Sequence, residues 1–416
     1  MPKIVDFKSR VVINSRGEKT PESEVYVSNG VGRYAAPSGA SRGAFEAPAF
    51  PEGGLGEAMR ILKQEVGPKL VGYEYSSQEE LDDFLRNLDG TPNYSRIGGA
   101  TAVSVSVAAA EAAAKSMNIP LYEWLSGGKK ISKFPLPLGN AAGGGKHSLG
   151  RATDIQEFLA MPLNAKSFTE AIFSLVGLHS RLGELLLNRD DFFLGGRNDE
   201  GAWSCSLSGY EILSLVAEAA KYVKTQTGIK FGLGIDLAAS SLWNPNLNLY
   251  VYKRSNSLRT RDEQIEYVLD LIGKFGLNYV EDPLNEQDFP GFSLITRRAP
   301  KTLICGDDLY VTSISRLMLG TRERAGNAVI IKPNQVGDLT GCREAVDLAR
   351  KRGFKVVVSH RSGETPTRHL AHIALAFEAD MIKSGIVGGE RVAKLNELMR
   401  IEEDLKRSVP LTRIQL

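Results

Sequence analysis

The chain has 416 residues, of which 42% are hydrophobic and 24% are charged, and its 51 basic and 49 acidic side chains give a formal net charge of +2. This length predicts two domains, because a single hydrophobic core rarely extends over so many residues. The balanced charge excludes the clustered basic excess typical of nucleic-acid-binding proteins, so no nucleic-acid partner is expected.

The sequence contains no signal for export or membrane insertion. The N-terminal stretch MPKIVDFKSR carries charges where a signal peptide has its apolar segment, and no run of about eighteen apolar residues predicts a membrane-spanning helix. The three cysteines, Cys205, Cys305 and Cys342, fit neither a disulfide framework nor the spacing of a zinc site. We therefore expect a cytoplasmic protein without a membrane partner, whose thiols are free and mostly buried.

The first part of the chain mixes strand and helix patterns. Residues 4–13 and 23–35 alternate apolar and polar side chains around a turn at Gly17, which predicts a two-stranded unit. Helical stretches follow over 54–70 and 99–115, and the alanine-rich second one suits close helix packing. This mixture predicts an α+β N-terminal capping domain.

A segment rich in proline and glycine, FPLPLGNAAGGGKHS (134–148), comes next. Such composition is typical of a domain boundary or a mobile loop, and we expect this segment to serve as both. The predicted domains are accordingly residues 1–128 and residues 129–416.

Short apolar runs recur at intervals from about residue 229 onward. They are FGLGID (231–236), LNYVED (277–282), TLICGDD (302–308), AVIIKP (328–333), KVVVSHR (355–361) and ADMIKSG (379–385). From the second run onward, stretches of helical periodicity such as 341–352 separate them. Strands that alternate with helices in this way predict parallel βα units, and enough of them in succession predict a closed β/α barrel.

Every one of these runs ends in a charged or polar residue. The residues concerned are Asp236, Glu281, Asp307, Lys332, His360 with Arg361, and Lys383. In a β/α barrel these positions meet at the C-terminal mouth, where active sites lie. A single strand often ends in a solvated charge, but packing gives no reason for six strands to do so, and we therefore predict a shared site.

Three of these residues are carboxylates, and together they form an all-oxygen ligand set. Hard divalent cations such as Mg²⁺ prefer such a set, which Asp236, Glu281 and Asp307 would supply. The alternative is that the carboxylates are salt-bridge partners of Lys332 and Lys383, and the two roles are compatible. Three converging carboxylates without a cation would repel one another strongly.

The two lysines suggest a chemistry for the site. A lysine beside a divalent cation and a second ammonium has a lowered pKa, because like charge disfavours its protonated form. Such a lysine is available as a base at neutral pH. The reaction class that this predicts is removal of a proton next to a carboxylate, with a metal ion holding the charge that develops.

The chain resembles the enolase family in nine collinear motifs that cover nearly its whole length. They are NSRGEKTPESEV (14–25), APSGASRGAFEA (36–47), DIQEFL (154–159), VEDPL (280–284), GDDLYVT (306–312), IIKPNQVGDLT (330–340), SHRSGET (359–365), MIKSG (381–385) and ERVAKLNELMRIEEDL (390–405). Single motifs of this length are weak evidence, but nine in the family's order and spacing are strong. Enolase-superfamily sites are known to combine a Lys or His base with Mg²⁺, so this chemistry is matched to the family.

The resemblance implies a role for each motif residue. The implied magnesium ligands are Asp236, Glu281 and Asp307. The implied catalytic residues are Lys332, Glu200, Glu157 and His360. The implied substrate-binding residues are Gln156, His147, Arg361, Ser362, Lys383 and Ser41.

Within these sets the resemblance gives particular tasks to some residues. Lys332 would remove the C2 proton, and Glu200 would help to expel the C3 hydroxyl. Lys383 would bind the substrate carboxylate, while Arg361 with Ser362 would hold the phosphate. Ser41 would join a second magnesium ion, in a loop that closes over the substrate.

The implied activity is the Mg²⁺-dependent interconversion of 2-phosphoglycerate and phosphoenolpyruvate, with two ions in each site. The implied assembly is a homodimer built through the N-terminal domain, or an octamer of such dimers.

Four positions depart from the family pattern near loops that close or support the site. Asn14 replaces an aspartate, NDEGA (198–202) replaces GDEGG, HSLG (147–150) replaces H-A-G-N with one extra residue, and Thr367 replaces an acidic residue. An active but divergent enolase accounts for them. So does a paralogue that acts weakly or on another phosphorylated 2-hydroxy acid. A third alternative, a non-catalytic binding protein that kept the barrel, would not need to bind magnesium.

Overall fold

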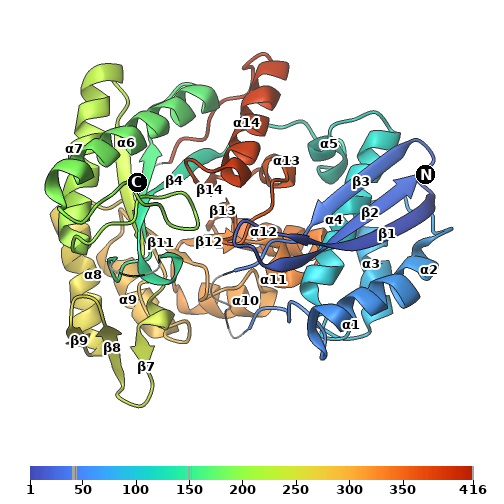
Figure 1. Ribbon diagram of the computed structural model, residues 1–416, viewed down its shortest axis with the longest axis horizontal. Coiled ribbons are helices and arrows are strands. Elements are labelled where there is room, and N and C mark those ends of the chain that lie inside the picture. The colour runs from blue at the N-terminus through green and yellow to red at the C-terminus, as the bar shows by residue number, and fades with distance from the viewer. Residues whose placement is uncertain (40–42, 44, 149, 151, 415–416) are drawn as a thin grey trace.

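The computed structural model describes residues 1–39, 43, 45–148, 150 and 152–414. Its N-terminal part packs helices against a three-stranded antiparallel sheet (Figure 1). These elements are β1 (Ile4–Ile13), β2 (Lys19–Val27), β3 (Gly30–Ala35), α1 (Gly54–Ile61), a π-helical turn η1 (Leu62–Val66), α2 (Gly67–Leu70), α3 (Gln78–Asp89), α4 (Gly99–Ser116) and α5 (Leu121–Leu125). The two predicted helices are both present, the first as α1, η1 and α2 without a break.

The prediction of a two-stranded unit was wrong, because residues 23–35 contain two strands rather than one. β2 and β3 pair antiparallel and reverse at Ser28 and Asn29. An Asn-Gly pair, here Asn29–Gly30, is a frequent hairpin turn and was the signal in the sequence. The predicted turn at Gly17 is present between β1 and β2, with a positive φ of 73°.

The second part of the chain forms a closed eight-stranded barrel, as predicted. In order around the barrel, its strands are β4 (Leu136–Gly143), β5 (Glu157–Pro162), β6 (Phe231–Asp236), β10 (Tyr279–Glu281), β11 (Leu303–Gly306), β12 (Ala328–Ile331), β13 (Lys355–Ser359) and β14 (Met381–Gly385). The six apolar runs predicted from the sequence are β6 and β10 to β14.

Helices surround the barrel strands. They are α6 (Phe168–Arg189), α7 (Gly209–Thr227), α8 (Arg261–Phe275), α9 (Phe289–Arg298), α10 (Ile314–Glu323), the short α11 (Pro333–Val336), α12 (Leu339–Lys351), α13 (His369–Ala376) and α14 (Gly389–Asp404). Short 3₁₀ turns are η2 (Gly145–His147) and η3 (Ala239–Ser241). Among the described residues, no helix has the length and apolar character needed to cross a membrane.

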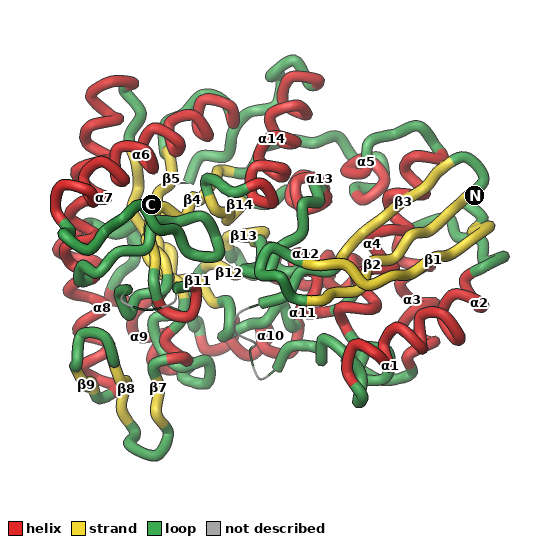
Figure 2. Tube along the Cα trace, in the orientation of Figure 1, coloured by secondary structure: helices red, strands yellow, loops and turns green. Residues whose placement is uncertain are grey.

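A small antiparallel sheet lies at the edge of the barrel beside α8 (Figure 2). Its strands are β7 (Trp243–Asn244), β8 (Leu249–Tyr252) and β9 (Ser257–Arg259). The loop after β9 leads directly into α8, so this sheet is an insertion between β6 and the next helix.

The expectation that residues 134–148 form a boundary and a mobile loop was wrong for most of that segment. Residues 136–143 are β4, which is buried along its whole length. A Cβ on Gly139 would meet Ile386 at 2.8 Å, and one on Gly143 would meet the carbonyl of Gln156 at 2.4 Å. The glycines are therefore required by close packing inside the barrel rather than by loop flexibility.

The βα pattern predicted a wholly parallel barrel, and this prediction was wrong for one strand. β5 pairs antiparallel with both β4 and β6, whereas the other neighbouring strands run parallel. The described residues of the connection from Gly143 to Glu157 form only η2 and no crossover helix, and two strands joined in that way pair antiparallel. Both α6 and α7 then follow β5.

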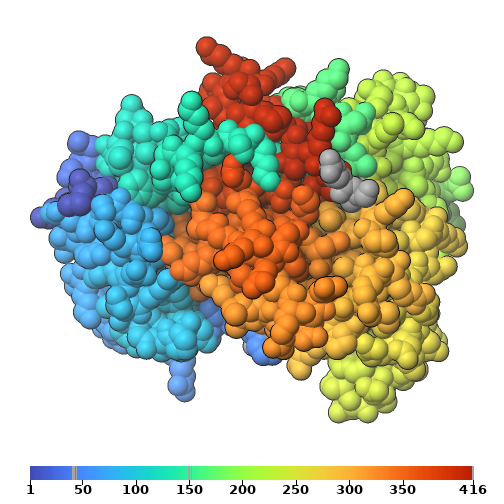
Figure 3. Space-filling model, turned by 180° about the vertical axis from the view of Figure 1, so that it is seen from behind, coloured from blue at the N-terminus to red at the C-terminus, as the bar shows by residue number. Residues whose placement is uncertain are grey.

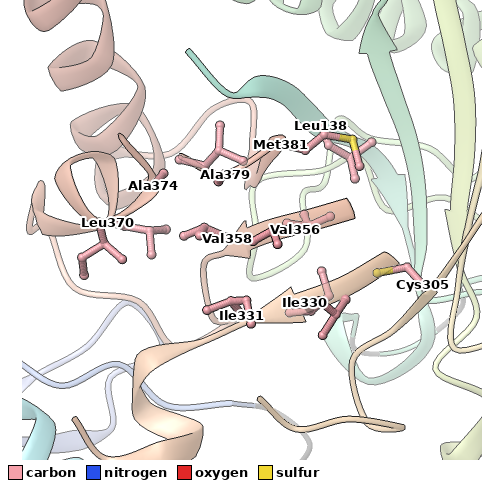
Figure 4. Packing of buried hydrophobic residues seen from close by; sticks show 14 of the residues in the cluster. Leu138, Cys305, Ile330, Ile331, Val356, Val358, Leu370, Ala374, Ala379 and Met381 are labelled. Atoms are coloured by element: carbon pink, nitrogen blue, oxygen red, sulfur yellow. The ribbon is translucent and has the colours of Figure 1, made fainter. Parts of the chain in front are cut away.

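Apolar side chains from adjacent strands and from α13 make a continuous core around the barrel (Figure 4). Ile330, Val356 and Met381 come from three neighbouring strands, and Leu370 comes from the covering helix. The three cysteines are free and buried, as predicted. This packing holds the strand ends in place at the mouth of the barrel.

Candidate active site

The carboxyl ends of the barrel strands meet at one pocket, as the sequence predicts. Asp236 and Glu281 are register neighbours at the carboxyl ends of β6 and β10, and Glu157, at the amino end of the antiparallel β5, is the register neighbour of Asp236. The pocket is lined by Gly39, Glu46, His147, Gln156, Glu157, Glu200, Asp236, Asp307, Asp308, Lys332, Ser359, His360, Arg361, Ser362 and Lys383. Glu281 is fully buried next to this lining. Ser41, which was predicted to bind substrate, lies outside the described residues.

The ammonium of Lys383 lies among three buried carboxylates. Its Nζ is 2.8 Å from both oxygens of Glu281, 3.2 Å from Asp236 and 3.0 Å from Glu157. Burial lowers the pKa of Lys383, but these carboxylates outweigh burial and raise the pKa well above its ordinary value. The salt bridges that the sequence left open as an alternative role are therefore present.

The same carboxylates fit a hard divalent cation. Because Asp236 and Glu281 both reach one ammonium, their oxygens point into one small volume. Burial and the charge of Asp236 raise the pKa of Glu281 to about 7, which reflects a shortage of positive charge. The carboxylate of Asp307 lies close to those of Asp282 and Asp308, with one oxygen from each within 4.8 Å of the others. An all-oxygen, acid-rich donor set of this kind suits Mg²⁺.

Lys332 forms an ion pair with Asp307. Burial lowers the pKa of Lys332, but the carboxylate of Asp307 outweighs burial, so the pKa is raised from its ordinary value. The lowered pKa expected from the sequence is therefore not found in this structure, because a carboxylate rather than a cation is the nearest partner.

Glu157 and Glu200 lie near His147, with one atom from each of the three side chains within 4.8 Å of the others. Burial raises the pKa of Glu157 well above its ordinary value, although Lys383 opposes this. Burial also acts to raise the pKa of Glu200, but the two histidines His147 and His360 outweigh it and the pKa falls well below its ordinary value. Two neighbouring carboxyls whose pKa values are shifted in opposite directions suit acid–base chemistry.

The pKa values of the two histidines of the pocket are shifted in opposite directions. The Nδ1 of His147 lies 3.0 Å from Asp199, and its Nε2 lies 3.6 Å from Glu200. Burial lowers the pKa of His147, but these carboxylates raise it above its ordinary value. For His360, whose Nε2 lies 3.4 Å from Glu200, burial prevails and lowers the pKa to about 4. His360 is therefore neutral at pH 7.

The residues predicted to hold the phosphate also line the pocket. The buried guanidinium of Arg361 lies 3.3–3.4 Å from the carboxylate of Glu46. Ser362 follows it in the chain, with its Oγ 3.5 Å from a guanidinium nitrogen of Arg16. Gln156, predicted to bind substrate, donates a hydrogen bond of 3.2 Å to Asp236. Arg361 therefore already contacts an anionic group in this pocket.

Sequence reasoning missed several residues that the fold brings to the site. Asn140 on β4 donates to Glu200 at 2.9 Å, and Glu46 contacts Arg361. Asp308 lines the pocket beside Asp307. The available signals were a lone amide in an apolar strand, a glutamate within the motif APSGASRGAFEA and the second aspartate of GDD.

Two of the departures from the enolase motifs close local turns. The side-chain oxygen of Asn14 accepts from the amides of Arg16 and Glu18 at 2.9 and 3.0 Å, in the turn between β1 and β2. That of Asn198 accepts from the amides of Glu200 and Ala202, each at 3.0 Å. Asparagine supplies an acceptor for such turns, so the loops keep a defined conformation at these positions.

Comparison with known proteins relates the whole chain to one family. A family model described as "Enolase, N-terminal domain" matches residues 4–125, and one described as "Enolase, C-terminal TIM barrel domain" matches residues 131–413. The chain is 47% identical to the enolase of Methanocorpusculum labreanum over 97% of its own length and 100% of that protein. It is 45% identical to the enolase of Pyrobaculum aerophilum over 99% of both chains, and 45% identical to that of Methanosphaera stadtmanae over 97% of both. Together with the barrel and its pocket, these matches show that the chain belongs to the enolase family.

Proposed function

We propose that this chain catalyses the Mg²⁺-dependent, reversible dehydration of 2-phospho-D-glycerate to phosphoenolpyruvate. The observation that carries the proposal is the pocket at the barrel mouth. Two lysines, an acid-rich donor set and a buried arginine line it together. Removal of a proton next to a carboxylate needs a base and a positive charge near the carboxylate. The loss of water needs an acid for the leaving hydroxyl. This pocket offers each of them.

In the proposed reaction, the Nζ of Lys332 takes the proton from C2. The electron pair of that C–H bond is first taken up by the substrate carboxylate, and it then forms the C2=C3 double bond as the C3–O bond breaks. The hydroxyl takes up a proton and leaves as water. Glu200 assists this loss, with Glu157 and Gln156 beside it, and His360 faces Glu200. The opposed pKa shifts of Glu157 and Glu200 support the assignment, because such a pair keeps a proton available.

We assign Asp236, Glu281 and Asp307 as the magnesium ligands. When bound, the ion supplies positive charge that stabilises the negative charge developing on the substrate carboxylate. Lys332 loses its partner when Asp307 serves as a ligand, and its proton then becomes easier to remove. The family resemblance implies two ions in each site, the second with Ser41.

The remaining residues bind the substrate in this proposal. Arg361 and Ser362 hold the phosphate, for which the planar donor fork of arginine is suited. Lys383 binds the substrate carboxylate. His147 contacts the substrate from the loop before β5. The contact of Arg361 with the Glu46 carboxylate supports the first assignment, because it shows the guanidinium directed at an anionic group within the pocket.

We extend the proposal to the organisation of the protein. The division at residues 128 and 129 is supported by the loop between α5, which ends at Leu125, and β4, which begins at Leu136. Family resemblance further suggests a cytoplasmic enzyme of glycolysis and gluconeogenesis that assembles as a homodimer or an octamer.

The first test is the absorbance at 240 nm during incubation with 2-phosphoglycerate, with and without Mg²⁺. A rise that depends on Mg²⁺ is the expected result, because the product contains a double bond conjugated with its carboxylate. Folded, magnesium-loaded protein that gives no rise contradicts the proposal. The paralogue would then be tested with other phosphorylated 2-hydroxy acids.

A further inference from the structure

Arg391 is the largest fully buried side chain among the described residues, and its guanidinium lies directly behind the active site. It belongs to α14 and is 0% exposed. Its NH2 group donates to the carbonyl oxygens of Asp199 at 2.9 Å and Ser362 at 2.7 Å. Its NH1 group donates to the carbonyl oxygen of Arg361 at 2.5 Å. One side chain thus joins the loop that carries Glu200 to the loop that carries Arg361 and Ser362.

The same NH1 group also lies 2.7 Å from the Nδ1 of His360. A guanidinium only donates hydrogen bonds, so Nδ1 must accept. The backbone amide of Gly385 points to the same Nδ1 from 3.5 Å and is likewise a donor. With two donors directed at Nδ1, the ring proton of the neutral imidazole resides on Nε2.

The protonated Nε2 lies beside the carboxylate of Glu200, although its N–H makes no hydrogen bond to that carboxylate in this structure. Nε2 of His360 lies 3.4 Å from Oε1 of Glu200, while the other oxygen of Glu200 accepts from Asn140 at 2.9 Å. The opposite tautomer would place a nitrogen lone pair against an ionised carboxylate, which is repulsive in a buried site. Space for this arrangement depends on Gly385, where a Cβ would meet the carbonyl of Glu200 at 2.0 Å and Arg391 at 3.1 Å.

We propose that Arg391 is a positioning residue for loss of the C3 hydroxyl: by donating to Nδ1, it holds His360 in the Nε2–H tautomer and so keeps that proton on the side of the ring next to Glu200. The kinetic consequence rests on the proposed function, whereas the tautomer is a property of the resting protein. The role is comparable to that of the second-layer partners that set the tautomer of histidines in other catalytic sites.

The tautomer is measured by long-range ¹H–¹⁵N correlation on folded protein labelled at histidine nitrogens. The chain has five histidines, and a His360→Gln variant identifies the signals of His360. At pH 7 the expected result is an unprotonated nitrogen signal for Nδ1 and a protonated one for Nε2. In Arg391→Met, and in Arg391→Lys, which keeps the charge but not the planar fork, the two signals should move toward each other as both tautomers become populated.

Lys394 provides the matched control. It lies on the same helix, is equally buried and donates to the carbonyls of Thr365 and Thr367 rather than to His360. Lys394→Met should therefore keep the wild-type tautomer. A proton on Nδ1 in the wild-type protein, or an unchanged pattern in whichever Arg391 variant folds, overturns the proposal.

The second readout separates positioning from general damage. In the Arg391 variants we expect dehydration to slow by about 10²-fold, the lower end of what a positioned acid or base contributes. Exchange of the C2 proton with solvent should fall by much less, because Lys332 makes no contact with Arg391. Equal losses of both rates would mean a merely structural role and would contradict the proposal. Absence of both activities in the wild-type protein would contradict the proposed function and leave the tautomer measurement standing.

Discussion

The two lysines at the barrel mouth meet different numbers of carboxylates, and this difference supports the separate roles proposed for them. Lys383 contacts Glu157, Asp236 and Glu281, whereas Lys332 pairs with Asp307. An ammonium among three carboxylates keeps its proton and suits the binding of a substrate carboxylate. Lys332, whose ammonium pairs with a single carboxylate, gives up its proton more readily than Lys383. The residue environments therefore support Lys332 as the base.

The first prediction concerns that base. Lys332→Ala should abolish exchange of the C2 proton with solvent, because no other amine takes its place, while substrate binding is largely retained. NMR of 2-phosphoglycerate in deuterated water measures the exchange, and titration calorimetry measures the binding. Lys383→Ala is the matched comparison, in which binding should weaken. Retained exchange in Lys332→Ala would refute the assignment.

The second prediction concerns Glu200. Glu200→Gln keeps the size of the side chain and a hydrogen-bonding group beside Asn140 and His360, but it removes the ionisable carboxyl. We expect this variant to permit some C2 exchange and to lose dehydration by about 10²-fold or more, because proton transfer to the hydroxyl fails. The same NMR samples report both rates. Normal dehydration would exclude Glu200 from the mechanism.

At the scale of elements, α13 and α14 are joined by a buried acid. The carboxylate of Glu397 on α14 lies 3.1 Å from His372 and 3.2 Å from Arg368, and Arg400 donates to it at 2.9 Å. These three partners, His372 first, lower the pKa of Glu397 to about 2 from an ordinary 4.5. A carboxyl with a lowered pKa in the folded state stabilises the protein fully above its unfolded pKa. That contribution is lost as the pH falls from 4.5 toward 2.

The third prediction follows from the lowered pKa of Glu397. The difference in free energy of unfolding between the wild-type protein and Glu397→Gln should be constant above about pH 5 and should shrink as the pH falls below about 4.5. Urea denaturation between about pH 6 and pH 3 measures it. Glu403→Gln, at an exposed position of the same helix, should give a curve parallel to the wild-type curve. A constant difference for Glu397→Gln across the range would contradict the account.

In the molecule as a whole, Asp338 joins the N-terminal domain to the barrel through hydrogen bonds. It caps α12 by accepting from the amide of Gly341 at 2.6 Å, and it accepts from Arg86 at 2.9 and 3.0 Å and from Tyr94 at 2.5 Å. Arg86 and Tyr94 belong to the N-terminal part. Seen from behind, the orange region that contains α12 lies directly against the blue and cyan atoms of that part (Figure 3).

The fourth prediction tests this interdomain contact. Arg86→Met should lower the free energy of unfolding by about 2 kcal/mol, because a buried carboxylate loses two charged hydrogen bonds. Urea denaturation followed by circular dichroism measures the change. Arg60→Met is the control, since Arg60 pairs with Glu57 and Glu65 at the exposed surface and should contribute much less to stability. Equal effects of the two variants would mean that the contact does not join the domains.

Over the whole chain, the barrel, its capping domain and the charged ends of its strands could be predicted from the amino-acid sequence alone. The reason is local: each apolar run predicts a strand, and a charge at its end, as at Asp236 or Lys332, is conspicuous without knowledge of any partner. Family motifs named the same positions independently. The roles of these residues remain predictions that the proposed variants test.

Features that depend on residues far apart in the chain became visible only in the folded protein. The buried state of β4 follows from strand neighbours that no local pattern specifies. Asn140 lies 60 residues from Glu200, and Arg391 lies 31 residues from His360. The protonation of a buried group is equally non-local, because it depends on the charges that the fold brings within a few ångströms. For that reason the lysine expected to have a lowered pKa was found paired with a carboxylate instead.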